Sequence, residues 1–249
     1  MGWAYSFSAT TGSNTLYFRI TDQSNKYVHV TPPAGMDENG WDGYTKPTGS
    51  LSIPSSVTYN GSTYSVKGMD NYAFSGCDGL TSVTIPSSIS TSVSGTFPNH
   101  ENACWFKNCS GLRTVSIPST FKTIPYQMFS MCTSLQSVSL PNVKEIHEHA
   151  FLGCSSLTSI TIPSSIESIG WMAFDYCTGL SSITIQATTP PFAQSNVFPS
   201  NSLLIYVPCG YVDDYQASSY WSSYTNIQGH LLWLQTWREI RTASKTLWP

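Results

Sequence analysis

A pattern of five fixed positions, followed by proline in four of the copies, occurs five times along this chain of 249 residues, and it constrains the fold more than any other feature. Each copy contains Phe, Cys, Leu, Val or Ile, and Ile or Leu at fixed spacing, and the first four copies end in Pro. The copies begin at Phe74, Phe106, Phe129, Phe151 and Phe174, with spacings of 32, 23, 22 and 23 residues. Self-similarity at a period of roughly 23 residues predicts a solenoid, in which each repeat forms one coil.

Each unit combines two periodicities. Phe74, Cys77 and Leu80 are three residues apart, which is the spacing of one face of a short helical turn. Apolar and polar residues then alternate, which indicates a strand, and the following proline ends the pairing. A second apolar pair, such as Ile166 and Ile169, leads into the next turn. Because one unit cannot bury these side chains alone, neighbouring units must stack and share a continuous core.

The repeated signature A-F-x-x-C-x-x-L-x-x-V/I-x-I-P-x-S-V/I-x-x-I-G resembles the BspA-like leucine-rich repeats of bacterial surface proteins. Residues Ile162 to Gly170 follow it closely, and the resemblance covers roughly residues 51–229. It implies a leucine-rich repeat solenoid that is mainly β with short helical turns. The expected form is a right-handed superhelix with N- and C-terminal caps. The resemblance also implies secretion or display at the cell surface, and a role in adhesion.

The expected organisation has four parts. We expect an N-terminal β-hairpin cap at 1–50, and a solenoid at 51–185 with five full repeats and one partial repeat. An insertion occupies 90–104, where a tight return would otherwise lie. A C-terminal cap follows at 186–229. The remaining tail, 230–249, matches nothing in the family pattern.

Caps are needed because an open solenoid leaves an unpaired edge and exposed core at each end. The N-terminal hairpin is expected to pair Leu16–Ile20 with Tyr27–Val30. The C-terminal cap is expected to contain a strand over Ser202–Pro208 and a helix over Tyr211–Trp221. Three interpretations of the tail stay open: a helix packed on the cap, sequence that is not native, or an amphipathic interaction helix.

Composition excludes several classes of function. Charged residues make up 10% of the chain, against about 25% in an average soluble protein. The net charge is −3, which argues against nucleic-acid binding through a basic face. No apolar run approaches the ~18 residues of a membrane span, so we expect none. The first residues also lack the pattern of a signal peptide.

Motifs for catalysis or cofactor binding are missing from the sequence. It contains neither a G-x-S-x-G nucleophile elbow nor a glycine-rich phosphate loop. His147, Glu148 and His149 form the most metal-like cluster, but a third ligand is missing nearby. We therefore expect no enzymatic activity, no cofactor and no metal site.

Five of the seven cysteines occupy one repeat position. Equivalent side chains in stacked units point in parallel, whereas a disulfide needs converging Cβ vectors. We expect these five to be small buried hydrophobes without disulfides. Cys104 and Cys209 lie outside the repeat position, and their pairing is left open.

The strands and the turns differ in their outward residues. Two outward columns on the strands carry only Ser and Thr, which provide no aromatic or arginine anchor of the kind that dominates binding energy. The turns before each Phe differ from copy to copy and contain larger side chains. The candidate partner-binding residues are Tyr72, Tyr126, His147, His149, Trp171 and Tyr176.

The function favoured by these observations is a non-enzymatic module for protein–protein interaction or adhesion. Its ligand would be a protein or glycan on a host or neighbouring cell, and we expect the chain to be a monomer. A glycan-binding module is one alternative, and it would need an aromatic shelf around Tyr126, Trp171 and Tyr176. A structural spacer that displays another domain is the second alternative.

Overall fold

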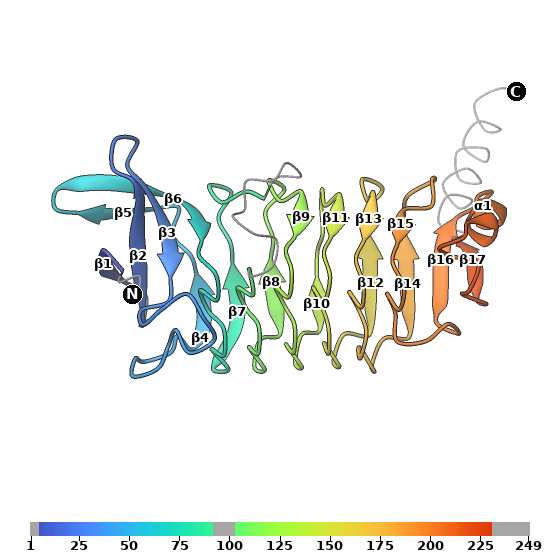
Figure 1. Cartoon of the computed structure of the whole chain (residues 1–249), viewed down its shortest axis with the longest axis horizontal. Coiled ribbons are helices and arrows are strands. Elements are labelled where there is room, and N and C mark those ends of the chain that lie inside the picture. The colour runs from blue at the N-terminus through green and yellow to red at the C-terminus, as the bar shows by residue number, and fades with distance from the viewer. Residues whose placement is uncertain (1–4, 92–102, 231–249) are drawn as a thin grey trace, which may run out of the picture.

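The computed structural model describes residues 5–91 and 103–230. Its coils follow one another in a single row between an N-terminal β-sheet and a small C-terminal unit (Figure 1). The expectations for residues 92–102 of the insertion and for 231–249 of the tail lie outside the described residues.

Parallel strands, one from each coil, form the long face of the solenoid. Four strands pair in the order β10-β8-β7-β4, and four more in the order β12-β14-β16-β17. The first sheet contains β4 (Gly49–Ser52), β7 (Leu80–Thr84), β8 (Thr114–Ser116) and β10 (Ser137–Val138). The second contains β12 (Ser159–Ile162), β14 (Ser182–Ile185), β16 (Leu204–Pro208) and β17 (Ile227–His230). Equivalent repeat positions pair, as Val83 does with Val115, so the predicted solenoid is confirmed.

A further parallel sheet forms on the side where each coil returns toward the next turn. Its order is β15-β13-β11-β9. The strands are β9 (Thr123–Ile124), β11 (Glu145–Ile146), β13 (Ser168–Ile169) and β15 (Phe192–Ala193). Ile146 pairs with Ile124 and Ile169, and all three are buried. The second apolar pair of each repeat therefore contributes a two-residue strand whose isoleucine is buried.

The repeated phenylalanines stack in one column through the core. Neighbouring ring centroids are 5.3 Å apart between Phe74 and Phe106 and 5.0 Å apart between Phe151 and Phe174. The column continues to Phe198 in the C-terminal cap. All five repeat phenylalanines have an exposed fraction of 0%.

A tryptophan closes the column at each end. The ring of Trp41 lies 6.4 Å from Phe74, and its indole N–H donates to the carbonyl of Ala73 at 3.0 Å. Trp221 lies 6.0 Å from Phe198, and its indole N–H donates to the carbonyl of Pro191 at 2.7 Å. Each tryptophan thus covers the last ring with apolar surface while its one polar group stays hydrogen-bonded.

Backbone hydrogen bonds join the coils at the same place. The N–H of Phe106 donates to Met128 of the next coil at 2.9 Å, and that of Phe129 donates to Ala150 at 2.8 Å. The residues two before and two after each Phe adopt a left-handed backbone, which turns alternate N–H groups toward the next coil. Gly153 takes one such position at no steric cost.

The repeated cysteines also contact the phenylalanines of the preceding coil. The Cys109 thiol donates to the carbonyl of Phe74 at 3.0 Å, and the Cys177 thiol donates to that of Phe151 at 3.1 Å. All seven cysteines are free. Burial raises the pKa of Cys109 to about 12, which keeps its sulfur in the unreactive thiol form.

The N-terminal cap is a five-stranded sheet with the order β1-β2-β3-β6-β5. The expected hairpin is present as β2 (Asn14–Asp22) and β3 (Tyr27–Thr31). β1 (Phe7–Thr11) adds to one side, and β6 (Ser62–Met69) with β5 (Ser56–Tyr59) adds to the other. The sheet therefore extends beyond residue 50, because alternate residues such as Val57, Tyr64 and Val66 are buried with the cap.

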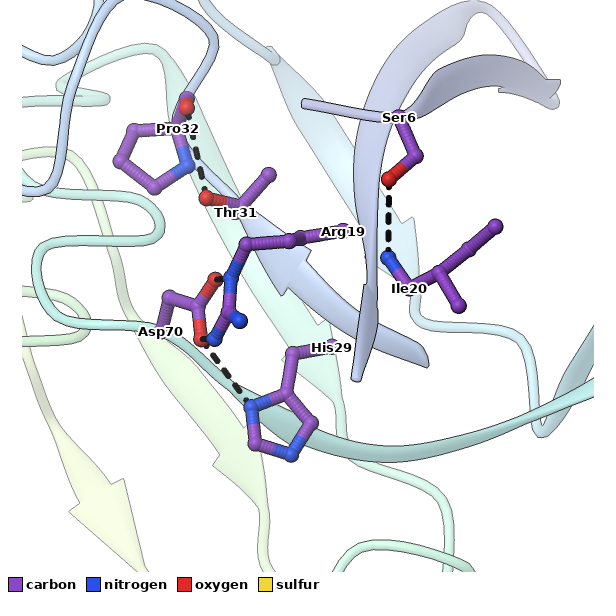
Figure 2. A network of polar contacts seen from close by, with 7 residues as sticks. All are labelled: Ser6, Arg19, Ile20, His29, Thr31, Pro32 and Asp70. Carbon is purple, nitrogen blue, oxygen red and sulfur yellow. Dashed lines mark hydrogen bonds and ion pairs between the residues drawn. The ribbon is translucent and has the colours of Figure 1, made fainter. Parts of the chain in front are cut away.

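A charged cluster joins this sheet to the first turn of the solenoid (Figure 2). Asp70, which follows β6, accepts two hydrogen bonds from Arg19 at 2.7 and 2.6 Å and lies 3.0 Å from His29 Nδ1. The Asp70 side chain is only 4% exposed. Burial would raise its pKa, but hydrogen bonds from His29 and Arg19, together with their charges, hold the pKa below the ordinary value.

The C-terminal cap differs in one detail from the expectation. Its strand is present as β16, but the helix α1 spans Val212–Ala217 instead of Tyr211–Trp221. The helix stops because Ser218 takes an extended backbone, with φ −71° and ψ 130°. That change of direction brings Trp221 beneath Phe198, where it closes the core.

Removing a ring from the column should destabilise the protein strongly. We expect Phe129→Ala and Phe151→Ala each to lower the free energy of unfolding by about 3–5 kcal/mol, since both the transfer energy and a cavity are involved. Chemical denaturation measures this change. Ser159→Ala, on the exposed face, is the control and should stay within about 0.5 kcal/mol of the wild type. Losses below about 1 kcal/mol at both phenylalanines would contradict a continuous core.

Replacing the buried carboxylate should loosen the N-terminal cap in a pH-dependent way. At pH 7, we expect Asp70→Asn to lower the free energy of unfolding by about 3 kcal/mol, because Arg19 loses its charged partner in a largely buried site. The folded pKa of Asp70 lies below the unfolded one, so its contribution is present above the unfolded pKa and is lost as pH falls through the folded pKa.

The difference between wild type and Asp70→Asn should therefore shrink at pH 3, as measured by urea denaturation at both pH values. Glu167→Gln, which removes the exposed pair with Lys144, is the matched control and should cost at most about 1 kcal/mol. An equal difference at pH 7 and pH 3 would show that the Asp70 charge contributes nothing.

Candidate functional site

The long parallel face presents the two hydroxyl columns as expected. Thr84, Ser116 and Thr161 point away from buried neighbours and are exposed. A hydroxyl–hydroxyl hydrogen bond of 2.8 Å joins Ser82 to Ser50 in the adjacent strand. At the C-terminal end, the columns end on β16, where Tyr206 pairs with Thr184. Over the repeats themselves, these two columns carry short uncharged side chains.

An aromatic ladder lies on the turns that follow β9, β11 and β13. The His149 ring stands between those of Tyr126 and Trp171, with centroid distances of 5.7 and 4.9 Å. Both contacts are edge-to-face, at 88° and 75°. We call these three residues the aromatic ladder. Its members come from three successive coils, so the repeat sets the distance between them.

The backbone holds His149 firmly in the ladder. It has a φ of +57°, and its N–H donates to the carbonyl of Trp171 at 3.0 Å. Its Nδ1 is buried without a hydrogen-bond partner. Burial lowers the pKa of the imidazole, although the charges of Glu148 and Asp175 oppose this shift. The histidine therefore acts at neutral pH as an uncharged aromatic spacer.

Tyr72 continues the same edge toward the N-terminus through polar contacts. It hydrogen-bonds with Cys104, and the Cys104 thiol in turn donates to Gln127 Oε1 at 3.4 Å. Burial, with the neighbouring Cys104, raises the pKa of Tyr72 to about 12. Cys104 therefore links Tyr72 to Gln127 in the neighbouring turn. Cys209 lies elsewhere and donates to the carbonyl of His230 at 3.0 Å.

The other two candidates are His147 and Tyr176. His147 faces Glu145, with Nε2 3.3 Å from its carboxylate. Tyr176 is 67% exposed, but it follows Phe174 instead of preceding it, and no ring contact links it to the ladder in the described ranges. Within those ranges, no group of three His, Cys, Asp or Glu side chains is placed to hold a metal ion.

A shallow open hollow of about 510 Å³ adjoins the ladder at its C-terminal end. Phe192 of β15 and Tyr220, which follows α1, form one side of it with ring centroids 4.7 Å apart. Trp171, Glu148 and Gln194 contribute to the remaining lining. The Gln194 side chain accepts a 2.5 Å hydrogen bond from the N–H of Trp171, which fixes this turn.

Neither Phe192 nor Tyr220 was expected at the site. Phe192 occupies the strand position that is Thr123, Glu145 and Ser168 in the three earlier coils. That equivalence is present in the sequence, but Pro190 and Pro191 interrupt the strand pattern just before it. The position of Tyr220 depends on the conformation of the C-terminal cap, which the repeat pattern does not predict.

The family model that matches this chain is the BspA-type leucine-rich repeat region, in six copies over residues 50–105 and 101–205. The chain belongs to this family. Leucine-rich repeat modules of this family from bacteria serve in protein interaction, and such repeats generally bind partners without catalysing reactions. No functionally curated protein matches the chain.

Solved structures of leucine-rich repeat proteins from bacteria resemble this one. A protein from Bacteroides ovatus is 25% identical with a TM-score of 0.51, and the match covers 82% of this chain and 55% of that one. A T. pallidum protein is 21% identical (TM-score 0.42; 80% and 70% covered). A leucine-rich cell surface protein from Faecalibacterium prausnitzii is 22% identical (TM-score 0.38; 90% and 73% covered).

The chain spans about half of the B. ovatus protein, 55% of its length. In this BspA-type chain, no helix within the described residues is both long and apolar enough to cross a membrane.

Proposed function

We propose that this chain is a non-enzymatic adhesion module that binds a protein partner through its turn edge. The observation that carries the proposal is the aromatic ladder. Trp171 is 40% exposed, yet its ring orientation is fixed against His149. Exposed aromatic side chains that are already held in place lose little conformational entropy on binding, and such residues dominate the energy of protein interfaces.

The hydroxyl face supports the proposal by contrast. Its side chains are short, repetitive and uncharged, so they offer neither anchors nor electrostatic selectivity. The turn edge differs in every coil. The position of Tyr126 and Trp171 is Asn71, Ala103 or Glu148 in the other coils, and the position of His149 is Tyr72, Cys104, Gln127 or Met172. A partner can therefore distinguish one coil from the next along this edge.

The proposed location is outside the cell or at its surface, following the association of the family. The cysteine chemistry is compatible with that location. Disulfide exchange and oxidation need the thiolate form, and burial raises the pKa of Cys132 and Cys154 well above the ordinary value. Thiols kept protonated and hydrogen-bonded to carbonyls resist an oxidising environment.

Paired variants test which surface binds. The wild-type chain is immobilised and probed with a panel of purified extracellular proteins, and separately with a glycan array. For a protein that binds, we expect Tyr126→Ala combined with Trp171→Ala to weaken binding by at least about 30-fold, equivalent to one anchor of ~2 kcal/mol. Ser139→Arg combined with Thr161→Arg, on the hydroxyl face, should leave binding unchanged.

Two results would contradict the proposal. Loss of binding in the arginine pair alone would place the site on the parallel strands. Binding on the glycan array without binding to any protein on the panel would favour a carbohydrate module. Unchanged far-UV circular dichroism in both pairs confirms that the comparison concerns surfaces and not folding.

A further inference from the structure

The hollow at the C-terminal end of the aromatic ladder has a chemistry of its own. Three partly exposed aromatic rings surround it: Trp171 at 40%, Phe192 at 44% and Tyr220 at 45%. Large aromatic surfaces that gather in a concave site mark binding surfaces, whereas isolated exposed rings do not. The rings come from three separate segments, so the folded cap is what assembles this site.

The orientation of the rings favours a compact group over a flat one. The planes of Phe192 and Tyr220 meet at 69°, and their centroids are 4.7 Å apart. Phe192 and Tyr220 therefore do not form one flat platform on which a sugar ring could stack across both. A corner of this kind instead presents ring faces to a small group from more than one side.

Charge then selects the kind of compact group. Glu148 lines the hollow, and the lining contains neither lysine nor arginine. Among the described residues, no ion pair neutralises Glu148. Asp175 adds negative potential nearby, since both carboxylates act on His149, while the opposing Lys107 lies 4.0 Å from Glu38. Aromatic faces beside a carboxylate attract cations.

We propose that the hollow binds a lysine or arginine side chain of the protein partner. This inference rests on the proposed function, and it names what the partner must present at one end of the turn edge. Trp171 belongs to both the ladder and the hollow, so a segment lying along the ladder would place a basic side chain directly between the three rings and Glu148. The ladder supplies contact area, and the hollow supplies selectivity for positive charge.

Ligand-observed saturation-transfer NMR on the whole chain tests the hollow without a known partner. The probes are N-acetyl-arginine methylamide and N-acetyl-lysine methylamide. The neutral isostere N-acetyl-citrulline methylamide and methyl β-glucoside serve as comparisons. We expect the two cationic probes to receive saturation about threefold or more above the citrulline probe, consistent with a cation–π contact at a partly exposed site.

Three variants assign the signal. Phe192→Ser combined with Tyr220→Ser should abolish it, and Glu148→Gln, which keeps shape and removes charge, should reduce it to the citrulline level. Tyr176→Ser removes an exposed ring elsewhere and should leave the signal unchanged. If the double aromatic variant fails to fold, Glu148→Gln alone still decides the question.

Equal saturation of the citrulline and arginine probes, or an undiminished signal in Glu148→Gln, would overturn the inference. So would preferential saturation of the glucoside. Trp171 belongs to both sites, but Glu148, Phe192 and Tyr220 are not changed in the test of the proposed function. The cationic probes could fail to bind while the Tyr126/Trp171 variant still loses partner binding. That combination would reject the basic side chain as an anchor but would still support the protein-binding module.

Discussion

Stacking of one phenylalanine per coil is the interaction on which the rest of this structure depends. Ring centroids repeat at 5.0 to 5.8 Å from Phe74 to Phe198, close to the ~4.8 Å separation of paired strands. Four of these phenylalanines donate their N–H groups to the next coil and accept a thiol hydrogen bond at their carbonyls: Phe74, Phe106, Phe129 and Phe151. Register, core and turn geometry are therefore set together at one position of the repeat.

This constraint divides the surface into two kinds. The two outward columns of the long parallel face must suit a regular sheet, and in the repeats they carry only Ser and Thr. Residues just before each Phe lie in turns whose backbone is fixed by the left-handed positions and by the hydrogen bonds between coils. Side chains there can vary without disturbing the core. Tyr126, His149 and Trp171 occupy such variable positions.

The sequence predicts the structural features that recur at equivalent positions of the repeat. The phenylalanine column, the buried cysteines, the hydroxyl face and the order of coils follow from aligning equivalent positions. The repeat also placed Tyr126, His149 and Trp171 in turns along one edge, although it could not show that their rings touch. The Asp70 cluster was missed because Arg19 is 51 residues away in the sequence. The hollow was missed because Tyr220 arrives from the cap, outside any repeated spacing.

Native-state hydrogen exchange tests most directly whether the phenylalanine column couples the coils from cap to cap. The N–H groups of Phe106, Phe129 and Phe151 each donate to the next coil, so their exchange reports the opening of each step. If the column couples them, their opening free energies agree within about 1 kcal/mol, and Trp221→Leu lowers all three together. A loss confined to Phe151, with Phe106 unchanged, would show that the coils open independently and would contradict the account.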